Sequence, residues 1–334
     1  MKKIISVLSI FAILLLSLSI NVSASTNDDF FTTQQGILLS KTDFDKLSTI
    51  GFSDEMINTM SINRVQHYLA KNYTKFITES KTIVDGIIIK QDEIINVRTI
   101  IDSDSVSNYS KNHLYTIAKE LVLSNVYNCT TGDYCDVLDY VSTGMTTLEH
   151  TIALDMDGTT GNIVTELTWN SMPSTREFDL ISFSIPSSFQ ILDETIYGHQ
   201  YYTKGGTSST IDYDYSELGT PYFNIDDQNV IMKANLVNNA LFSPVTALRI
   251  DLTAEFQLTQ ASLTQIRDLD LYRIRFISDY YHAIKVISTS YSVSAMAGFG
   301  TVGPEAGASI SITATFVSKF DDGREVNSQI IINN

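Results

Sequence analysis

Side chains in the second half of this sequence alternate between apolar and polar along one segment after another. In MTTLEHTIALDM, which begins at Met145, apolar side chains share one face, and the segment beginning at Ile163 repeats the pattern after a polar stretch. A period of two places every second side chain on the same face of a β-strand. The alternation therefore predicts paired, half-buried strands.

Turn residues divide this part of the chain into many short strands. Asp157-Gly158, between the first two segments, is typical of a β-hairpin turn. Further strand-like segments are FDLISFSI, STIDYDYS, NVIMKANL, ALRIDLTAEFQL and DLYRIRFIS, separated by SMPS, KGGT, GTP and FSP. Many strands with few helices between them predict an antiparallel β-sandwich, which we place at residues 126–334.

Short helices are predicted ahead of the strands. Thr42 can cap a helix that Gly51 ends, and Ser53 and Ser61 can cap two more. The segment HLYTIAKELVLSNVY also fits an amphipathic helix, whereas IVDGIIIKQDEIINVRTII fits either a strand or a buried helix. We therefore expect a mostly helical region over residues 25–125. The predicted fold class is α+β, a small N-terminal helical region followed by an antiparallel β-sandwich.

The first residues predict export. Lys2 and Lys3 precede an apolar stretch over residues 4–20, and Val22-Ser23-Ala24 offers small residues at a cleavage site. This order is typical of a secretory signal peptide, here residues 1–24, rather than of a retained membrane anchor. We expect a secreted, extracellular protein of the Gram-positive type of export.

The charge of the chain excludes one class of partner. The sequence has 22 Lys and Arg residues against 38 Asp and Glu residues, a formal net charge of −16. An acidic surface repels phosphate backbones, so we expect no binding of nucleic acid.

Two cysteines lie close together in NCTTGDYCD. Cys129 and Cys135 form a nearby even pair, and outside the cell such a pair usually oxidises. We predict a disulfide that closes a short local loop. A metal pair is the alternative, but the sequence has no second Cys or His pair at ligand spacing.

Two motifs resemble phosphate chemistry. Gly298–Gly303 matches G-x-G-x-x-G, but the alternating ASISITATF follows it where a dinucleotide-binding turn requires a helix. The segment LDMDGTTG resembles the first motif of haloacid-dehalogenase phosphatases, yet the strand before Asp155 alternates and no βα unit follows. We therefore predict no organic cofactor. A loose Ca²⁺ site at Asp155 and Asp157 is the alternative, since paired Asp oxygens suit that ion.

No catalytic set is evident in the sequence. The five histidines, His67, His113, His150, His199 and His282, do not form HExxH, and G-x-S-x-G is absent. His282 has Tyr280 and Tyr281 beside it, which is typical of a hydrogen-bonded structural histidine. The sequence favours a protein that is not an enzyme, with an extracellular hydrolase as the third hypothesis.

Residues 286–318 form a long amphipathic ribbon. Ile287, Val293 and Ala295 share one face of the first arm, and serines occupy the other. The return arm alternates in the same way, with Ile310 and Ile312 among its apolar residues. Secreted pore-forming toxins insert hairpins of this pattern, whereas an ordinary sandwich buries the apolar face in its core. A membrane-active hairpin is therefore the second hypothesis, and only this hypothesis implies contact with a membrane.

Several phrases resemble exported proteins of unknown function from Bacillus-like Gram-positive bacteria. They are LSKTDFDKLSTIGFSDEMINTM, LTWNSMPSTREFDLISFSI, SDYYHAIKV and the turn GFGTVG before a last strand. That group carries a W-x-x-M-P-x-x-R-x-x-D-like segment, here Trp169, Met172, Pro173, Arg176 and Asp179. The resemblance implies a short helical region before a β-rich part and brings no established activity. We expect a secreted, non-catalytic protein that binds a cell-envelope polymer or another protein.

Overall fold

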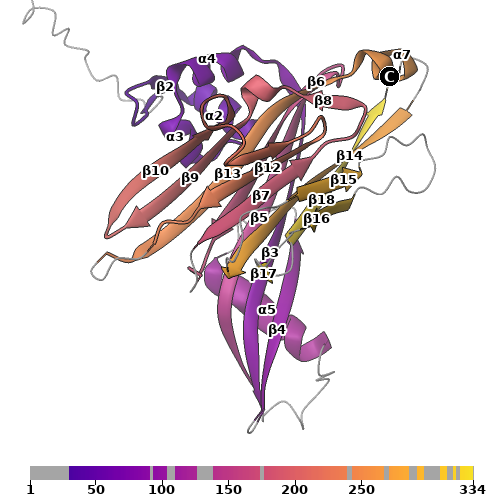
Figure 1. Ribbon diagram of the computed structural model, residues 1–334. Coiled ribbons are helices and arrows are strands. Elements are labelled where there is room, and N and C mark those ends of the chain that lie inside the picture. The colour runs from indigo at the N-terminus through magenta and orange to yellow at the C-terminus, as the bar shows by residue number, and fades with distance from the viewer. Residues whose placement is uncertain are drawn as a thin grey trace, which may run out of the picture.

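The computed structural model describes residues 30–90, 93–103, 110–125, 138–173, 177–238, 243–266, 271–285, 292–296, 309–313, 319–320 and 324–333. Their strands form two large sheets that pack face to face, as Figure 1 shows. Every strand pair within these ranges is antiparallel. The predicted antiparallel β-sandwich is confirmed.

The larger sheet has eight strands. In spatial order they are β10 (Thr207–Asp214), β9 (Tyr197–Lys204), β13 (Val245–Leu258), β6 (Thr160–Trp169), β5 (Leu138–Asp155), β3 (Tyr73–Lys90) and β4 (Glu93–Ser103), with β8 (Phe189–Ile191) beside β13. The six-stranded sheet contains β11 (Phe223–Ile225), β12 (Asn229–Asn235), β7 (Phe178–Ser184), β14 (Leu271–Lys285) and β17 (Lys319–Phe320), with β18 (Arg324–Asn333) beside β14.

Smaller elements complete the described fold. Two hairpins are not hydrogen-bonded to the large sheets: β1 (Phe30–Thr32) with β2 (Leu38–Ser40), and β15 (Ser292–Met296) with β16 (Ser309–Thr313). The helices are α2 (Lys41–Thr49), α3 (Asp54–Thr59), α4 (Ile62–Ala70), α5 (Lys111–Asn125), α6 (Tyr215–Leu218) and α7 (Gln260–Ile266), with the 3₁₀ turn η3 (Asp193–Thr195). Among the described residues, no helix is both long and apolar enough to cross a bilayer.

The main core lies between the two sheets. Leu148, Ile152 and Leu154 of β5 are buried there, as the alternation predicts, and they meet Ile181 and Phe183 of β7 across the interface. The predicted hairpin is confirmed, because β5 pairs with β6 around a turn in which Gly158 has a φ of 66°. Burial of these apolar side chains is the main favourable contribution to the stability of the sandwich.

Helices α2, α3 and α4 cover the outer face of the larger sheet (Figure 1). Leu47, Ile57 and Val65 pack with Ala153 and Val164 of the sheet in a second core. The chain therefore has three layers at this point, and the sheet is buried on both faces. The outer face also carries many polar side chains, and these determine what the helices contact.

The predicted helix caps are confirmed at two positions and corrected at one. The Ser53 and Ser61 hydroxyls accept hydrogen bonds from the first turns of α3 and α4. The cap of α2 is Ser40 rather than Thr42, because the Ser40 hydroxyl accepts from the Asp43 amide. Gly51 follows the end of α2 with a φ of 106°, as its proposed role requires.

The prediction of a mostly helical region over residues 25–125 is wrong. Residues 73–103 contain β3 and β4, which extend the larger sheet beyond β5. Their many Ile and Val side chains favour a strand, because β-branched residues are stiff and pack well on a pleated surface. The predicted helix near His113 is confirmed as α5, which packs against β3, β4 and β5 where these strands extend from the sandwich (Figure 1).

Several predictions fall on residues outside the described ranges. These are the signal peptide at residues 1–24, the Cys129–Cys135 disulfide and the GFGTVG turn. The described segment after that turn, β16, is a strand that pairs with β15, so the paired-ribbon interpretation is confirmed over these two strands. Their register sets Val293 opposite Ile312 and Ala295 opposite Ile310.

Candidate functional site

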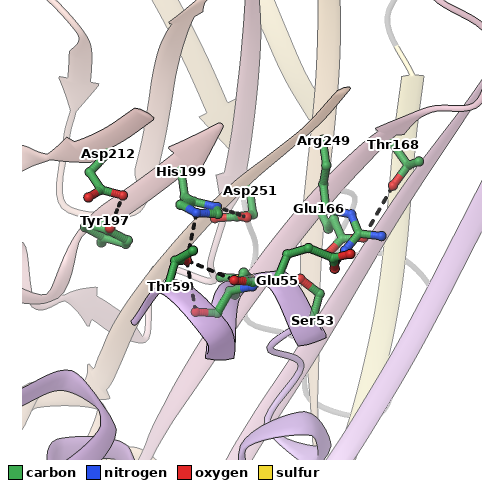
Figure 2. A network of polar contacts seen from close by, with 11 residues as sticks. Ser53, Glu55, Thr59, Glu166, Thr168, Tyr197, His199, Asp212, Arg249 and Asp251 are labelled. Atoms are coloured by element: carbon green, nitrogen blue, oxygen red, sulfur yellow. Dashed lines mark hydrogen bonds and ion pairs between the residues drawn. The ribbon is translucent and has the colours of Figure 1, made fainter. Parts of the chain in front are cut away.

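A row of ionisable residues crosses the outer face of the larger sheet. Glu149 of β5 is the cross-strand partner of Glu166 of β6, which is in turn the partner of Asp251 of β13. Asp251 is the partner of His199 of β9, and His199 is the partner of Asp212 of β10. Five adjacent strands thus place four carboxyl groups and one imidazole side by side beneath α3, and Figure 2 shows four of the five. We call these residues the polar row.

Three carboxyl groups of the polar row, those of Glu149, Glu166 and Asp251, have pKa values above the ordinary range. Burial raises the pKa of Glu166 to about 7, although Arg249 opposes the shift, and neighbouring Asp251 and Glu149 raise it further. Burial likewise raises the pKa values of Glu149 and Asp251. Like charges on directly opposed strand positions repel one another, so it is unfavourable to ionise Glu149, Glu166 and Asp251 together.

Arg249 connects the polar row to α3. Its guanidinium lies 3.1 Å from Glu166 Oε1 and also pairs with the Glu55 carboxylate of α3 (Figure 2). Attraction to Glu166 and Glu55 outweighs burial and raises the pKa of Arg249. Arg249 therefore balances two carboxyl groups from different layers and fixes the position of the N-terminal turn of α3.

Thr59, His199 and Asp251 form a chain of contacts that resembles a catalytic triad. Thr59 Oγ1 lies 3.0 Å from His199 Nε2, and His199 Nδ1 lies 2.9 Å from Asp251 Oδ2 (Figure 2). The Thr59 hydroxyl, however, donates its proton to the Glu55 carbonyl at 2.9 Å. Thr59 must then accept from His199 Nε2, which is the reverse of the polarity that an activated nucleophile needs.

The His199–Asp251 pair is a structural anchor. Burial lowers the pKa of His199, but Asp251 outweighs this effect and raises it above the ordinary value. The cavity beside Thr59 and His199 measures about 10 Å³, which is room for one water molecule at most. A substrate has no access to the imidazole from that side.

Helix α4 is attached to the same sheet face by further charged contacts. The Arg64 guanidinium lies 3.7 Å from the centre of the Tyr197 ring and 3.0 Å from Asp214. Lys71 Nζ and the Tyr73 hydroxyl each lie 2.9 Å from the buried Glu255 carboxylate. These contacts hold the helical layer rigidly on the sheet.

An open groove of about 220 Å³ lies beside α3. Three segments contribute to its walls: the β1–β2 hairpin with Phe31 and Gln34, α3 with Asp54 and Asn58, and the β9–β10 hairpin with Tyr201 and Ser208. Glu55 and Thr59 also face it, so the groove adjoins the anchored end of the polar row. We call it the α3 groove.

The α3 groove contains polar groups that the described part of the chain leaves without partners. They are the Asp54 carboxylate, the Gln34 side-chain amide and Asn58 Nδ2. Asn58 Oδ1 is occupied, because it accepts from the Gln34 backbone amide at 2.9 Å. A few polar groups that converge on one concave surface can fix the orientation of a ligand.

No family model and no curated protein matches this chain. Among solved structures, the collagen-binding domain of a Staphylococcus aureus adhesin is 9% identical, with a TM-score of 0.28 over 53% of this chain and 89% of that one. The collagen-binding subdomain of the Enterococcus faecalis surface protein ACE is 11% identical, with a TM-score of 0.24 over 52% and 88% of the two chains. The membrane-inserted NetB toxin of Clostridium perfringens is 10% identical, with a TM-score of 0.19 over 57% and 91%. At these scores the similarity carries no argument about function, which rests on the chain's own residues.

The Asp155-Asp157 pair has a structural explanation. The Asp155 carboxylate accepts from the Thr159 amide at 2.8 Å, the Thr159 hydroxyl at 3.0 Å and the Thr160 hydroxyl at 2.9 Å. Asp155 thereby closes the β5–β6 turn, while Asp157 is exposed. Within the described ranges, no group of three or more His, Cys, Asp or Glu side chains is placed to hold a metal ion. Calcium binding at this turn stays a prediction.

The two histidines of the sandwich interior have structural partners. His282 Nδ1 lies 2.6 Å from Asp179 Oδ1, as expected of a hydrogen-bonded structural histidine. His150 Nδ1 lies 3.0 Å from the Ser278 hydroxyl, and burial lowers the pKa of His150 to about 3. Neither histidine lines the α3 groove, and the structure does not bring them together with the polar row.

Sequence reasoning missed both the polar row and the α3 groove. The alternation does place Glu149 on the polar face of its strand, and Asp212, Glu166 and Asp251 occupy comparable positions. The sequence feature that could have predicted the polar row is an ionisable residue on the polar face of each of several strands. Only the register between strands, which alternation does not determine, shows that these residues are neighbours.

The raised pKa of Glu166 predicts a pH-dependent effect of Glu166→Gln. The pKa of Glu166 in the folded state, about 7, lies above the ordinary value of 4.5. The favourable contribution of protonated Glu166 to the free energy of unfolding is therefore complete below pH 4.5 and is lost as the pH rises through 7. A neutral Gln avoids that loss. Urea unfolding should show Glu166→Gln close to wild type at pH 4.5 and more stable by about 2–3 kcal/mol at pH 8.

The exposed Glu177 provides the control for this experiment. Glu177→Gln should change the free energy of unfolding by less than about 0.5 kcal/mol at either pH. A difference between Glu166→Gln and wild type that is the same at pH 4.5 and pH 8 would contradict the assignment of a raised pKa to Glu166.

Proposed function

We propose that this chain is an exported, non-catalytic binding protein of the cell exterior and that its ligand contacts the α3 groove. The observation that carries the proposal is the convergence of unused groups from Gln34, Asp54 and Asn58 on one open groove. Export is the function of the leader predicted at residues 1–24, and the resemblance to exported proteins of Bacillus-like bacteria supports a Gram-positive source.

The hydrogen bonds of the polar groups near α3 favour a binding protein over a hydrolase. The Thr59 hydroxyl donates to a backbone carbonyl, and His199 is held between Thr59 and Asp251. Glu166 is paired with Arg249 beneath α3. A hydrolase needs an acid, a base or a nucleophile that act together on its substrate. In the described part of the α3 groove, Asp54 has the one unpaired carboxylate, because Glu55 is paired with Arg249 and the Thr59 hydroxyl donates to a backbone carbonyl.

A membrane-active hairpin is the second candidate, favoured by the register of β15 and β16. Hydroxyl residues oppose one another at Ser292–Thr313 and Ser294–Ser311, between the apolar pairs. This is the alternation that an inserting hairpin requires. Dye release from liposomes by the purified protein would support this candidate, and an absence of release at neutral and acidic pH would contradict it.

Filling the groove tests the principal proposal. Gln34→Trp places an indole in the α3 groove, whereas Gln35→Trp makes the same change at an exposed neighbour that does not line it. The probes are insoluble Gram-positive cell walls, with and without their anionic polymers, and immobilised extracellular-matrix protein. We expect wild type and Gln35→Trp to bind the same probe, and Gln34→Trp to lose at least about tenfold in affinity.

Two outcomes would contradict the proposed function. Equal binding by wild type, Gln34→Trp and Gln35→Trp would show that the ligand does not contact the α3 groove. Binding of wild type to none of the wall or protein probes would contradict a binding role at the cell exterior.

A further inference from the structure

We infer that the α3 groove recognises an uncharged, hydroxyl-rich saccharide segment. The inference rests on the proposed function, because it names the ligand class of the same groove. Four properties of the groove carry it: its unused hydrogen-bonding groups, its aromatic walls, its charge and its size.

The unused polar groups match the hydrogen bonds of a sugar ring. The Asp54 carboxylate offers two acceptor oxygens, Asn58 Nδ2 offers donors, and the Gln34 side chain offers both. Each sugar hydroxyl can donate one hydrogen bond and accept others, and neighbouring hydroxyls on a ring present these functions side by side. A carboxylate flanked by two amides can therefore satisfy several hydroxyls of one ring at the same time.

Aromatic side chains line the same groove. Phe31 is 36% exposed, and its ring packs against Phe44 with the centroids 4.9 Å apart, so it is held in place. Tyr201 donates from its hydroxyl to Ser208 at 2.8 Å, which fixes the orientation of a second ring. Fixed aromatic rings offer apolar surface to the C–H groups of a ligand that also has a polar side. Sugars have both kinds of surface.

The charge of the groove disfavours anionic ligands and offers a cationic ligand a single unpaired carboxylate. Its lining contains the Asp54 and Glu55 carboxylates and no Lys or Arg among the described residues. With the net charge of −16, this repels phosphate and carboxylate polymers. The Glu55 carboxylate is already paired with Arg249, so Asp54 alone would attract a cation. The other unused groups, the side-chain amides of Gln34 and Asn58, are uncharged and suit a neutral ligand.

The size and rigidity of the groove suggest how a saccharide would bind. Its volume of about 220 Å³ is below the range of about 300–1,000 Å³ typical of pockets that enclose a small molecule. It is also open to solvent, so a longer chain can lie across it with part of its length in contact. The Gln34 backbone amide donates to Asn58 Oδ1, which joins the β1–β2 hairpin to α3. Thr59 of α3 is hydrogen-bonded to His199 of β9. The three walls of the groove are therefore connected in the absence of a ligand.

The test measures binding of wild-type protein to soluble neutral hexasaccharides of glucose and of N-acetylglucosamine. Polyglycerol phosphate is the anionic probe, oligolysine is the cationic probe, and the immobilised matrix protein is the protein probe. We expect a neutral saccharide to bind, with an affinity that changes less than about twofold when the salt concentration rises tenfold. Asp54→Ala should weaken that binding at least about tenfold. Asp227→Ala, which removes another exposed carboxylate far along the chain in the β11–β12 turn, should leave it unchanged.

Failure of this inference is distinguishable from failure of the proposed function. If only oligolysine, polyglycerol phosphate or the matrix protein binds, and Gln34→Trp abolishes that binding, the saccharide inference is wrong while the groove remains the binding site. If a saccharide binds but neither Asp54→Ala nor Gln34→Trp weakens it, both statements are wrong.

Discussion

Replacing Asp179 with alanine should lower the free energy of unfolding by about 3–5 kcal/mol. Asp179 is fully buried and accepts three side-chain hydrogen bonds, from Trp169 Nε1 at 3.1 Å, the Tyr280 hydroxyl at 2.5 Å and His282 Nδ1 at 2.6 Å. Alanine would remove the acceptor that these three buried donors share, and water cannot replace it in the interior. Urea unfolding at pH 7 measures the change.

Asp179 also joins the two layers of the sandwich. Trp169 ends β6 in the larger sheet, whereas Asp179, Tyr280 and His282 belong to the smaller one. Asp157→Ala, at an exposed position in a turn, is the matched control and should change stability by less than about 0.5 kcal/mol. A loss below about 1 kcal/mol for Asp179→Ala would mean that this buried cluster does not hold the sheets together.

The second large effect is expected at Gly51, where alanine should cost about 2–5 kcal/mol. Its φ of 106° is unfavourable for any residue with a Cβ, and an added Cβ would lie 2.5 Å from Thr151 Cβ. The loop after α2 therefore approaches β5 too closely for a side chain. The substitution should lower the thermal unfolding temperature and loosen the helical layer that carries α3.

The substitution Gly36→Ala separates the cost of the backbone conformation from the cost of the steric clash. Its φ of 74° is also left-handed, but a Cβ there would meet nothing within 4 Å. Gly36→Ala should therefore cost only the backbone part, about 1–2 kcal/mol. Equal effects at Gly51 and Gly36 would show that α2 and β5 separate easily, contrary to the close contact in the structure.

Local features of this fold, such as helix caps and a hairpin turn, are predicted well from the sequence. The capping hydroxyls of Ser53 and Ser61, the hairpin at Asp157-Gly158 and the core face of β5 are each determined by residues within a few positions of one another. The assignment failed over residues 73–103, where Ile and Val fit a strand or a buried helix equally well. Pairing with β5, which is far along the chain, decides between the two.

The candidate site depends on contacts between distant residues. The α3 groove joins Gln34 and Asp54 to Tyr201, and nothing in the sequence brings the β9–β10 hairpin beside α3. The polar row likewise requires the register of five strands. One partial exception exists: the phrases that carry the family resemblance contain Trp169, Asp179 and His282, which meet in one buried cluster. Another of those phrases, LSKTDFDKLSTIGFSDEMINTM, contains Asp54 and Asn58 of the α3 groove, but nothing in it shows that they meet Gln34 and Tyr201.

Hydrogen exchange with and without the tightest-binding soluble probe tests the location of the site most directly. If the ligand contacts the α3 groove, backbone amides in Asp54–Thr59 and in residues 201–208 should exchange more slowly in the complex, and those of α5 should not change. Protection confined to β15 and β16, to α5 or to the exposed edge of β4 would contradict the account, even if the affinity of the probe is high.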